Sequence, residues 1–223
     1  MKYLQQLTAV LLLIIVFSVN ASAQNLPVKA VGKVTEVQIS GQQINLKTEN
    51  AQAEITVYSP SVIRVRLDKA AFKPDFSYAV IAKPQTAKVN ITQNPVQISI
   101  VTDSVKAIIT KAPFSVSFFT LDGKAINEEE NGLNTSWVNE SVTAYRKMQP
   151  NERFIGLGEK TGPLDRIGNG YTNWNSDNFG YAATQDPLYS TIPFYIGIHD
   201  HLNYGIFLDN TYQTDFNFGA SNN

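Results

Sequence analysis

The sequence contains no cysteine and only two histidines. Without cysteine the chain can form neither a disulfide nor a thiolate nucleophile, so its fold must be stabilised by its hydrophobic core. Both histidines, His199 and His201, lie in the single stretch HDHLNYG, which argues against catalysis by a serine–histidine pair. A chain of 223 residues is long enough to bury such a core as one domain.

Metal ligands are equally scarce. His199, Asp200 and His201 could contribute to a metal site, but no further ligands follow at a suitable spacing. We therefore interpret HDHLNYG as the polar tip of a hairpin between two strands. We expect no metal and no cofactor.

The chain also lacks an excess of basic residues, with 18 lysines and arginines against 19 aspartates and glutamates. Binding to a nucleic-acid backbone requires a basic face, so we expect no nucleic-acid partner. The acidic cluster NEEE, residues 127–130, is interpreted as a solvated loop because neighbouring like charges favour exposure to water.

A long apolar run occurs at the start of the sequence. Lys2 precedes an apolar run at residues 7–19, and the small residues ASA follow, ending at Ala23. This arrangement is typical of a secretory signal peptide. We expect residues 1–23 to be removed and the protein to be periplasmic or secreted. The alternative is an uncleaved membrane anchor, but the run is shorter than the ~20 residues that cross a bilayer, so we expect no stable anchor.

Helical periodicity is missing as well, since no segment keeps a helical spacing of apolar residues for three turns. Apolar and polar residues alternate over short runs instead, which is the pattern of strands with one buried face. The runs are QINLKT, EITVYS, VIRVRL, PVQISI and FSVSF. The pair Asp122-Gly123 predicts a hairpin after the last run. We therefore predict an all-β fold, an antiparallel β-sandwich, over residues 24–223.

Two motifs resemble a phosphate-binding loop and a kinase motif, but the residues that should accompany them are missing. GLGEKTG, residues 156–162, lacks the adjacent Gly-Lys-Thr of a phosphate-binding loop, and no helical pattern follows it. Its glycines indicate a tight turn or a close approach of two backbones. DNFG, residues 177–180, is not accompanied by other kinase motifs.

The stretch YTNWNSDNFGYAATQDPLYSTIPFY, residues 171–195, is rich in aromatic rings and amides. Tyr171 and Trp174 offer flat apolar faces on which the C–H bonds of a sugar ring can lie. Asp177 can accept hydrogen bonds from two neighbouring hydroxyls, and Asn173, Asn175 and Asn178 add donors and acceptors. The alternative is a structural loop whose rings plug one end of the core and whose amides cap turns. The residue types alone fit both interpretations.

Four motifs carry a specific resemblance. They are FIGLGEKTGPL, then YTNWNSD followed by GY, then DPLYSTIPF, and then YGIFLDNTY, all within residues 154–219. This segment resembles the amino-terminal domain of glycoside hydrolase family 31, which includes α-glucosidases and α-xylosidases. The resemblance implies a galactose-mutarotase-like β-sandwich that packs against a (β/α)8 barrel. It also implies that a sandwich loop helps to bind an α-linked oligosaccharide, with Asp177 beside the scissile bond and Trp174, Asn175 and Phe179 shaping the loop.

The same resemblance bears on catalysis. Retaining glycosidases use two carboxylates, and in this family both are aspartates of the barrel, which is absent from residues 24–223. We expect the isolated chain to be inactive and its sandwich to be incomplete at the C-terminus, as in an amino-terminal piece of a longer enzyme. Two alternatives are a free-standing carbohydrate-binding module and a mutarotase-like sugar epimerase. The epimerase needs a histidine and a glutamate facing one sugar, which two histidines in one hairpin tip do not readily provide.

Overall fold

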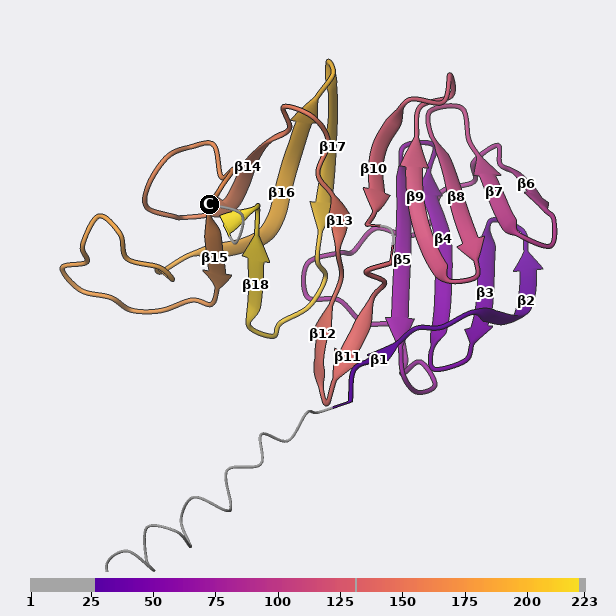
Figure 1. Cartoon of the computed structure of the whole chain (residues 1–223), viewed down its shortest axis with the longest axis horizontal. Coiled ribbons are helices and arrows are strands. Elements are labelled where there is room, and N and C mark those ends of the chain that lie inside the picture. The colour runs from indigo at the N-terminus through magenta and orange to yellow at the C-terminus, as the bar shows by residue number, and fades with distance from the viewer. Residues whose placement is uncertain (1–26, 131, 221–223) are drawn as a thin grey trace, which may run out of the picture.

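The computed structural model describes residues 27–130 and 132–220, so the signal peptide predicted at residues 1–23 lies outside them. The described residues form eighteen strands and no α-helix, and the sheets are antiparallel (Figure 1). Within these residues no helix could cross a membrane. The all-β fold predicted from the sequence is therefore confirmed.

The first part of the fold is a two-layered sandwich, seen on the right of Figure 1. One layer has the strand order β2-β3-β4-β5, with β2 (Val34–Ser40), β3 (Gln43–Thr48), β4 (Gln52–Ser59) and β5 (Val62–Asp68). The other has the order β13-β10-β9-β8-β7-β6, with β6 (Asn90–Gln93), β7 (Gln97–Val101), β8 (Lys106–Lys111), β9 (Phe114–Phe119), β10 (Ala125–Glu129) and β13 (Arg146–Lys147). The hairpin predicted at Asp122-Gly123 joins β9 to β10. A small sheet, β1 (Lys29–Ala30), β11 (Ser136–Val138) and β12 (Ser141–Thr143), lies at one end.

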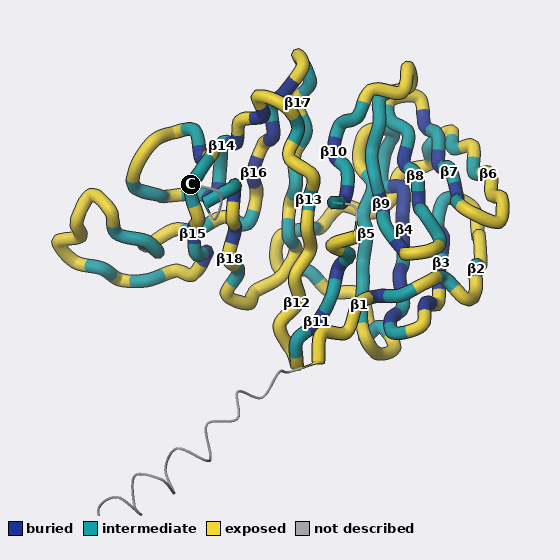
Figure 2. The backbone as a smooth tube through the Cα atoms, in the orientation of Figure 1, coloured by how far each residue is buried: buried dark blue, intermediate teal, exposed yellow. Residues whose placement is uncertain are grey.

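The alternating residues form the core between the two layers. Ile44 and Ile55 are register partners in one layer, Ile98 and Ile109 are partners in the other, and all four are fully buried in one cluster. Figure 2 shows buried segments, in dark blue, among the strands of both layers. Fully burying each such side chain contributes about 1.5–3 kcal/mol. Val96, which continues the alternation of PVQISI, is exposed because β7 begins only at Gln97.

The second part of the fold has its own aromatic core. Its sheets are β14-β16-β17 and β15-β18, formed by β14 (Arg153–Gly158), β15 (Gly170–Asn173), β16 (Thr191–His199), β17 (Leu202–Phe207) and β18 (Thr214–Asn217). The buried residues are Phe154, Leu157, Tyr171, Tyr195, Phe216 and Phe218. Phe154 stacks on Phe218 with ring centroids 4.6 Å apart.

The glycines of GLGEKTG allow two backbones to approach closely, as the sequence indicated. A Cβ at Gly156 would lie 2.5 Å from the carbonyl oxygen of Phe194, and one at Gly158 would lie 2.6 Å from that of Ser190. Both glycines have positive φ, and the pairing of β14 with β16 is irregular between them. These glycines therefore allow β14 to pack closely against β16.

Two interpretations of polar residues were wrong. The cluster NEEE belongs mostly to β10, where alternation buries Asn127 and Glu129. Burial raises the pKa of Glu129, although Arg146, 3.8 Å away, partly offsets this effect. His199 is not in the hairpin tip but at the end of β16. There it is buried, and its Nε2 lies 2.9 Å from the carbonyl oxygen of Ile126.

The hairpin tip itself consists of Asp200 and His201. Both have positive φ, as the two central residues of a type I′ turn between antiparallel strands require. Beside this hairpin the hydroxyl of Tyr204 donates a 2.6 Å hydrogen bond to the buried carboxylate of Glu152. Burial, together with this bond, raises the pKa of Tyr204 far above its usual value. The contact of His199 with the carbonyl oxygen of Ile126 connects β16 in the second part of the fold to β10 in the first.

Candidate functional site

The candidate site is the loop of residues 174–190, between β15 and β16. Its inner end is held by Asp186, which accepts hydrogen bonds from Lys160 Nζ at 2.8 Å and from the backbone N–H of Thr172 at 2.5 Å. Lys160 also donates to the carbonyl oxygen of Thr172 at 2.6 Å, and its side chain is fully buried. A buried ammonium needs such partners, because removing it from water is expensive. This ion pair therefore fixes the loop to β15.

Amide side chains hold the rest of the loop. Asn175 Oδ1 accepts from the backbone N–H of Thr191 at 2.8 Å and from its hydroxyl at 2.9 Å. Asn178 Nδ2 donates to the carbonyl oxygen of Pro187 at 2.7 Å, and the hydroxyl of Tyr189 donates to the carbonyl oxygen of Asn178 at 2.6 Å. Leu188, itself a residue of the loop, is buried. These amides therefore hold the loop in place, as the structural alternative expects.

Asp177 differs from its neighbours. It is exposed, and within residues 27–130 and 132–220 its carboxylate takes part in no hydrogen bond and no ion pair. Desolvation and then the charge of Asp177 raise the pKa of the nearby Tyr189. Phe179, two residues on, is 99% exposed. The loop is tied down through its other polar groups, so the Asp177 carboxylate is available to a ligand.

Trp174 and Asn175 line a hollow of about 340 Å³, to which Asp177 and Phe179 do not contribute. Its lining residues are Asn173, Trp174, Asn175, Thr191, Pro193, Asn210, Thr211, Tyr212 and Thr214. The four residues proposed from the sequence therefore fall into two groups on one loop. Tyr171, which the sequence offered as a second ring for a sugar, is buried in the aromatic core.

One amide that lines this hollow, Asn173, is unusual. Asn173 is 5% exposed, and neither its Oδ1 nor its Nδ2 has a partner among the described residues. Leaving a buried polar group unpaired costs about 1–3 kcal/mol. The sequence pointed to Asn173 but missed Asn210 and Tyr212. Their only signal was the motif LDNTY, whose position beside the loop follows from the pairing of β15 with β18.

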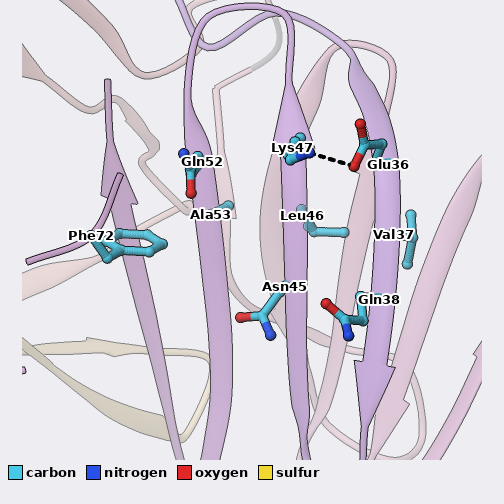
Figure 3. Close-up of a pocket in the computed structure, with 9 residues that line it drawn as sticks. All are labelled: Glu36, Val37, Gln38, Asn45, Leu46, Lys47, Gln52, Ala53 and Phe72. Carbon is cyan, nitrogen blue, oxygen red and sulfur yellow. Dashed lines mark ion pairs between the residues drawn. The ribbon is translucent and has the colours of Figure 1, made fainter. Parts of the chain in front are cut away.

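A second hollow, of about 240 Å³, lies against β2, β3 and β4 of the four-stranded sheet β2-β3-β4-β5 (Figure 3). Its charged residues Glu36 and Lys47 form an ion pair with each other at 2.7 Å. Phe72 is its one aromatic residue, and the Arg66 guanidinium lies 4.5 Å from that ring's centroid. Because its charged and aromatic groups already have partners, this hollow is a weaker candidate.

Metal binding finds no support in the part of the chain that is described. No three histidine, aspartate or glutamate side chains there lie close enough together to hold an ion. Asp200 and His201 stay at the hairpin tip, whereas His199 is buried against Ile126. The site chemistry is thus that of amides, hydroxyls, aromatic rings and one available carboxylate.

Two alpha-glucosidases are similar in sequence to this chain. Alpha-glucosidase 2 of Bacillus thermoamyloliquefaciens is 28% identical over 173 residues, which are 74% of this chain and 21% of that protein. An alpha-glucosidase of Saccharolobus solfataricus is 31% identical over 118 residues, 52% of this chain and 17% of that protein. The chain therefore spans about a fifth of the length of these relatives.

Solved structures of GH31 enzymes are also similar to this chain. A GH31 dextranase of Flavobacterium johnsoniae, complexed with isomaltotriose, matches with a TM-score of 0.79 and 30% identity, covering 86% of this chain and 24% of that one. The family model of the glycosyl hydrolase 31 N-terminal galactose mutarotase-like domain matches residues 52–217. The chain belongs to this family of galactose-mutarotase-like amino-terminal domains of glycoside hydrolase family 31.

Proposed function

We propose that this chain is the amino-terminal domain of a secreted, α-glucosidase-like glycosidase and that it contributes Asp177 to the substrate site. The observation that carries the proposal is the available carboxylate of Asp177 on a loop whose other polar groups are engaged. A carboxylate can accept from two neighbouring sugar hydroxyls, and such charge-assisted hydrogen bonds are the stronger kind. The ligand is an α-linked oligosaccharide.

The anchoring of the loop favours this role. The Lys160–Asp186 pair and the bonds of Asn175 to Thr191 restrain the loop at both ends. A site held by its own contacts loses little freedom when a ligand binds, so more of the interaction energy contributes to affinity. In the complete enzyme the barrel would supply the two catalytic aspartates, and Asp177 would lie beside the bond that is cleaved.

A mutarotase-like epimerase is less consistent with the geometry. That reaction needs a histidine and a glutamate facing one sugar. Here His199 is buried against the carbonyl oxygen of Ile126, while His201 lies at the tip of a turn. Neither histidine lines the hollow beside the loop. His199 Nε2 lies 4.0 Å from Glu152 Oε1, but both side chains are buried, so this pair does not face a sugar.

The proposal is tested by comparing the chain with the full-length protein. Purified full-length protein should hydrolyse 4-nitrophenyl α-glucoside or α-xyloside, and the 223-residue chain alone should not exceed the buffer rate. The reason is that positioning without the two carboxylates leaves the reaction unassisted. Turnover by the chain alone, abolished in an Asp177→Ala variant, would show that the chain carries its own catalytic groups and would overturn the proposal.

Export is a separate part of the proposal and rests on the charged start, apolar run and ASA site of residues 1–23. After expression in a Gram-negative host, the mature protein should begin at Gln24 and be found in the periplasm or the medium. Intact-mass analysis of each cell fraction measures this. A species that retains Met1 in the inner membrane would contradict cleavage.

A further inference from the structure

The hollow beside the loop is lined entirely by uncharged residues. Its polar groups are amides and hydroxyls, from Asn173, Asn175, Asn210 and three threonines. Such a lining offers no counter-charge to a phosphate, a carboxylate or a cation, so the hollow fits a neutral ligand that carries several hydroxyls. Its volume of about 340 Å³ lies near the lower end of small-molecule sites, which span roughly 300–1,000 Å³.

Two aromatic side chains line this hollow and remain largely accessible. Trp174 is 50% exposed and Tyr212 is 84% exposed. They come from different segments, since Trp174 begins the loop after β15 and Tyr212 lies between β17 and β18. Aromatic faces of this kind suit the flat C–H face of a pyranose ring. An acyclic polyol has the same hydroxyls but no such face.

Hydrogen-bonding capacity is left unused in the same place. Both amide atoms of the buried Asn173 have no partner among the described residues. Asn210 accepts through Oδ1 from the backbone N–H of Tyr212 at 2.9 Å, and its Nδ2 donates to no group among the described residues. A ligand or water that reaches these groups would satisfy amides that the protein itself does not satisfy.

We propose that this hollow is a pyranoside-binding subsite contained within this chain, in which Trp174 and Tyr212 contact the ring and Asn173 and Asn210 bond its oxygens. The subsite deepens the proposed function and rests on it for the class of ligand, because Trp174 belongs to the same loop as Asp177. It requires neither the catalytic barrel nor the Asp177 carboxylate.

Titration of the 223-residue chain with methyl α-D-glucopyranoside tests the subsite. The chain has two tryptophans, and Trp137 is buried, so a change in tryptophan fluorescence reports on Trp174. We expect a saturable change that sorbitol does not produce. Tyr212→Ala should weaken binding by about tenfold, the effect of losing one aromatic contact. Tyr78→Ala is the matched control, since Tyr78 is 81% exposed but does not line the hollow, and it should bind like the wild type.

Three outcomes would overturn the subsite: no saturable response in the wild type, an equal response to sorbitol, or unchanged binding in Tyr212→Ala. A thermal melt of each variant shows whether it is folded, and Asn210→Leu, which removes the donor while keeping a similar volume, provides a second variant. The proposed function is tested instead by turnover of the full-length protein and by the kinetics of its Asp177→Ala variant. Failure of either test is therefore distinguishable from failure of the other.

Discussion

Replacement of Asp186 by alanine should destabilise the protein by about 3–5 kcal/mol, the usual result of removing one partner from a buried ion pair. The change leaves the fully buried ammonium of Lys160 without its carboxylate and leaves the backbone N–H of Thr172 without an acceptor. Because the same pair fixes the loop to β15, the loop should detach as well. Urea unfolding followed by tryptophan fluorescence measures the loss.

Asp215→Ala is the matched control for this experiment. Asp215 lies opposite Thr172 in the pairing of β15 with β18 and accepts from its hydroxyl at 2.6 Å, but it is exposed and pairs with no buried cation. Its loss should cost less than about 1 kcal/mol. In the double variant Lys160→Met/Asp186→Ala much of the stability should return, because no buried charge is left unpaired. Wild-type stability in Asp186→Ala alone would refute the anchoring role of this pair.

Replacement of Asp177 should have the opposite effect to replacement of Asp186, because it should lower activity and leave stability unchanged. In the full-length protein, Asp177→Ala should leave the midpoint of thermal unfolding unchanged, since this carboxylate has no partner within the described chain. Loss of a charged hydrogen bond to substrate should cost about 1.5–3 kcal/mol, which lowers kcat/KM for maltose by one to two orders of magnitude. Steady-state kinetics on maltose measure the effect. Asp103→Ala, at an exposed turn between β7 and β8, is the control and should be neutral.

The strands were predictable because alternation is a local property. Ile44, Ile55 and Ile98 each lie in one of the alternating runs, and each faces the core. Ile109 faces the same core from β8, which was not among those runs. The same rule was less informative for IPFYIGI, where Ile192, Phe194 and Ile196 are exposed while Tyr195 is buried. Both faces of that strand are apolar in sequence, so the pattern alone does not select the buried face.

The role of each polar residue was harder to predict because it depends on contacts between distant segments. Asp177 and Asp186 lie in one loop, and only the position of Lys160, 26 residues before Asp186, shows which of them is structural. From the sequence, His199 looked like part of a turn. In the structure the turn contains only Asp200 and His201, so His199 is the last residue of β16, and its side chain is buried. Glu129 looked solvated, although alternation along β10 buries it. The sequence resemblance located the loop, and the structure separates its anchors from its available groups.

The measurement that tests the central claim most directly is the loss of kcat/KM on two substrates in full-length Asp177→Ala. Maltose carries hydroxyls on its leaving sugar, whereas 4-nitrophenyl α-glucoside lacks them. If Asp177 binds the sugar beyond the scissile bond, the loss on maltose should exceed the loss on the aryl glucoside by about tenfold or more. Equal losses on both substrates, accompanied by a lower unfolding temperature, would show that Asp177 supports the loop and would contradict its role in binding.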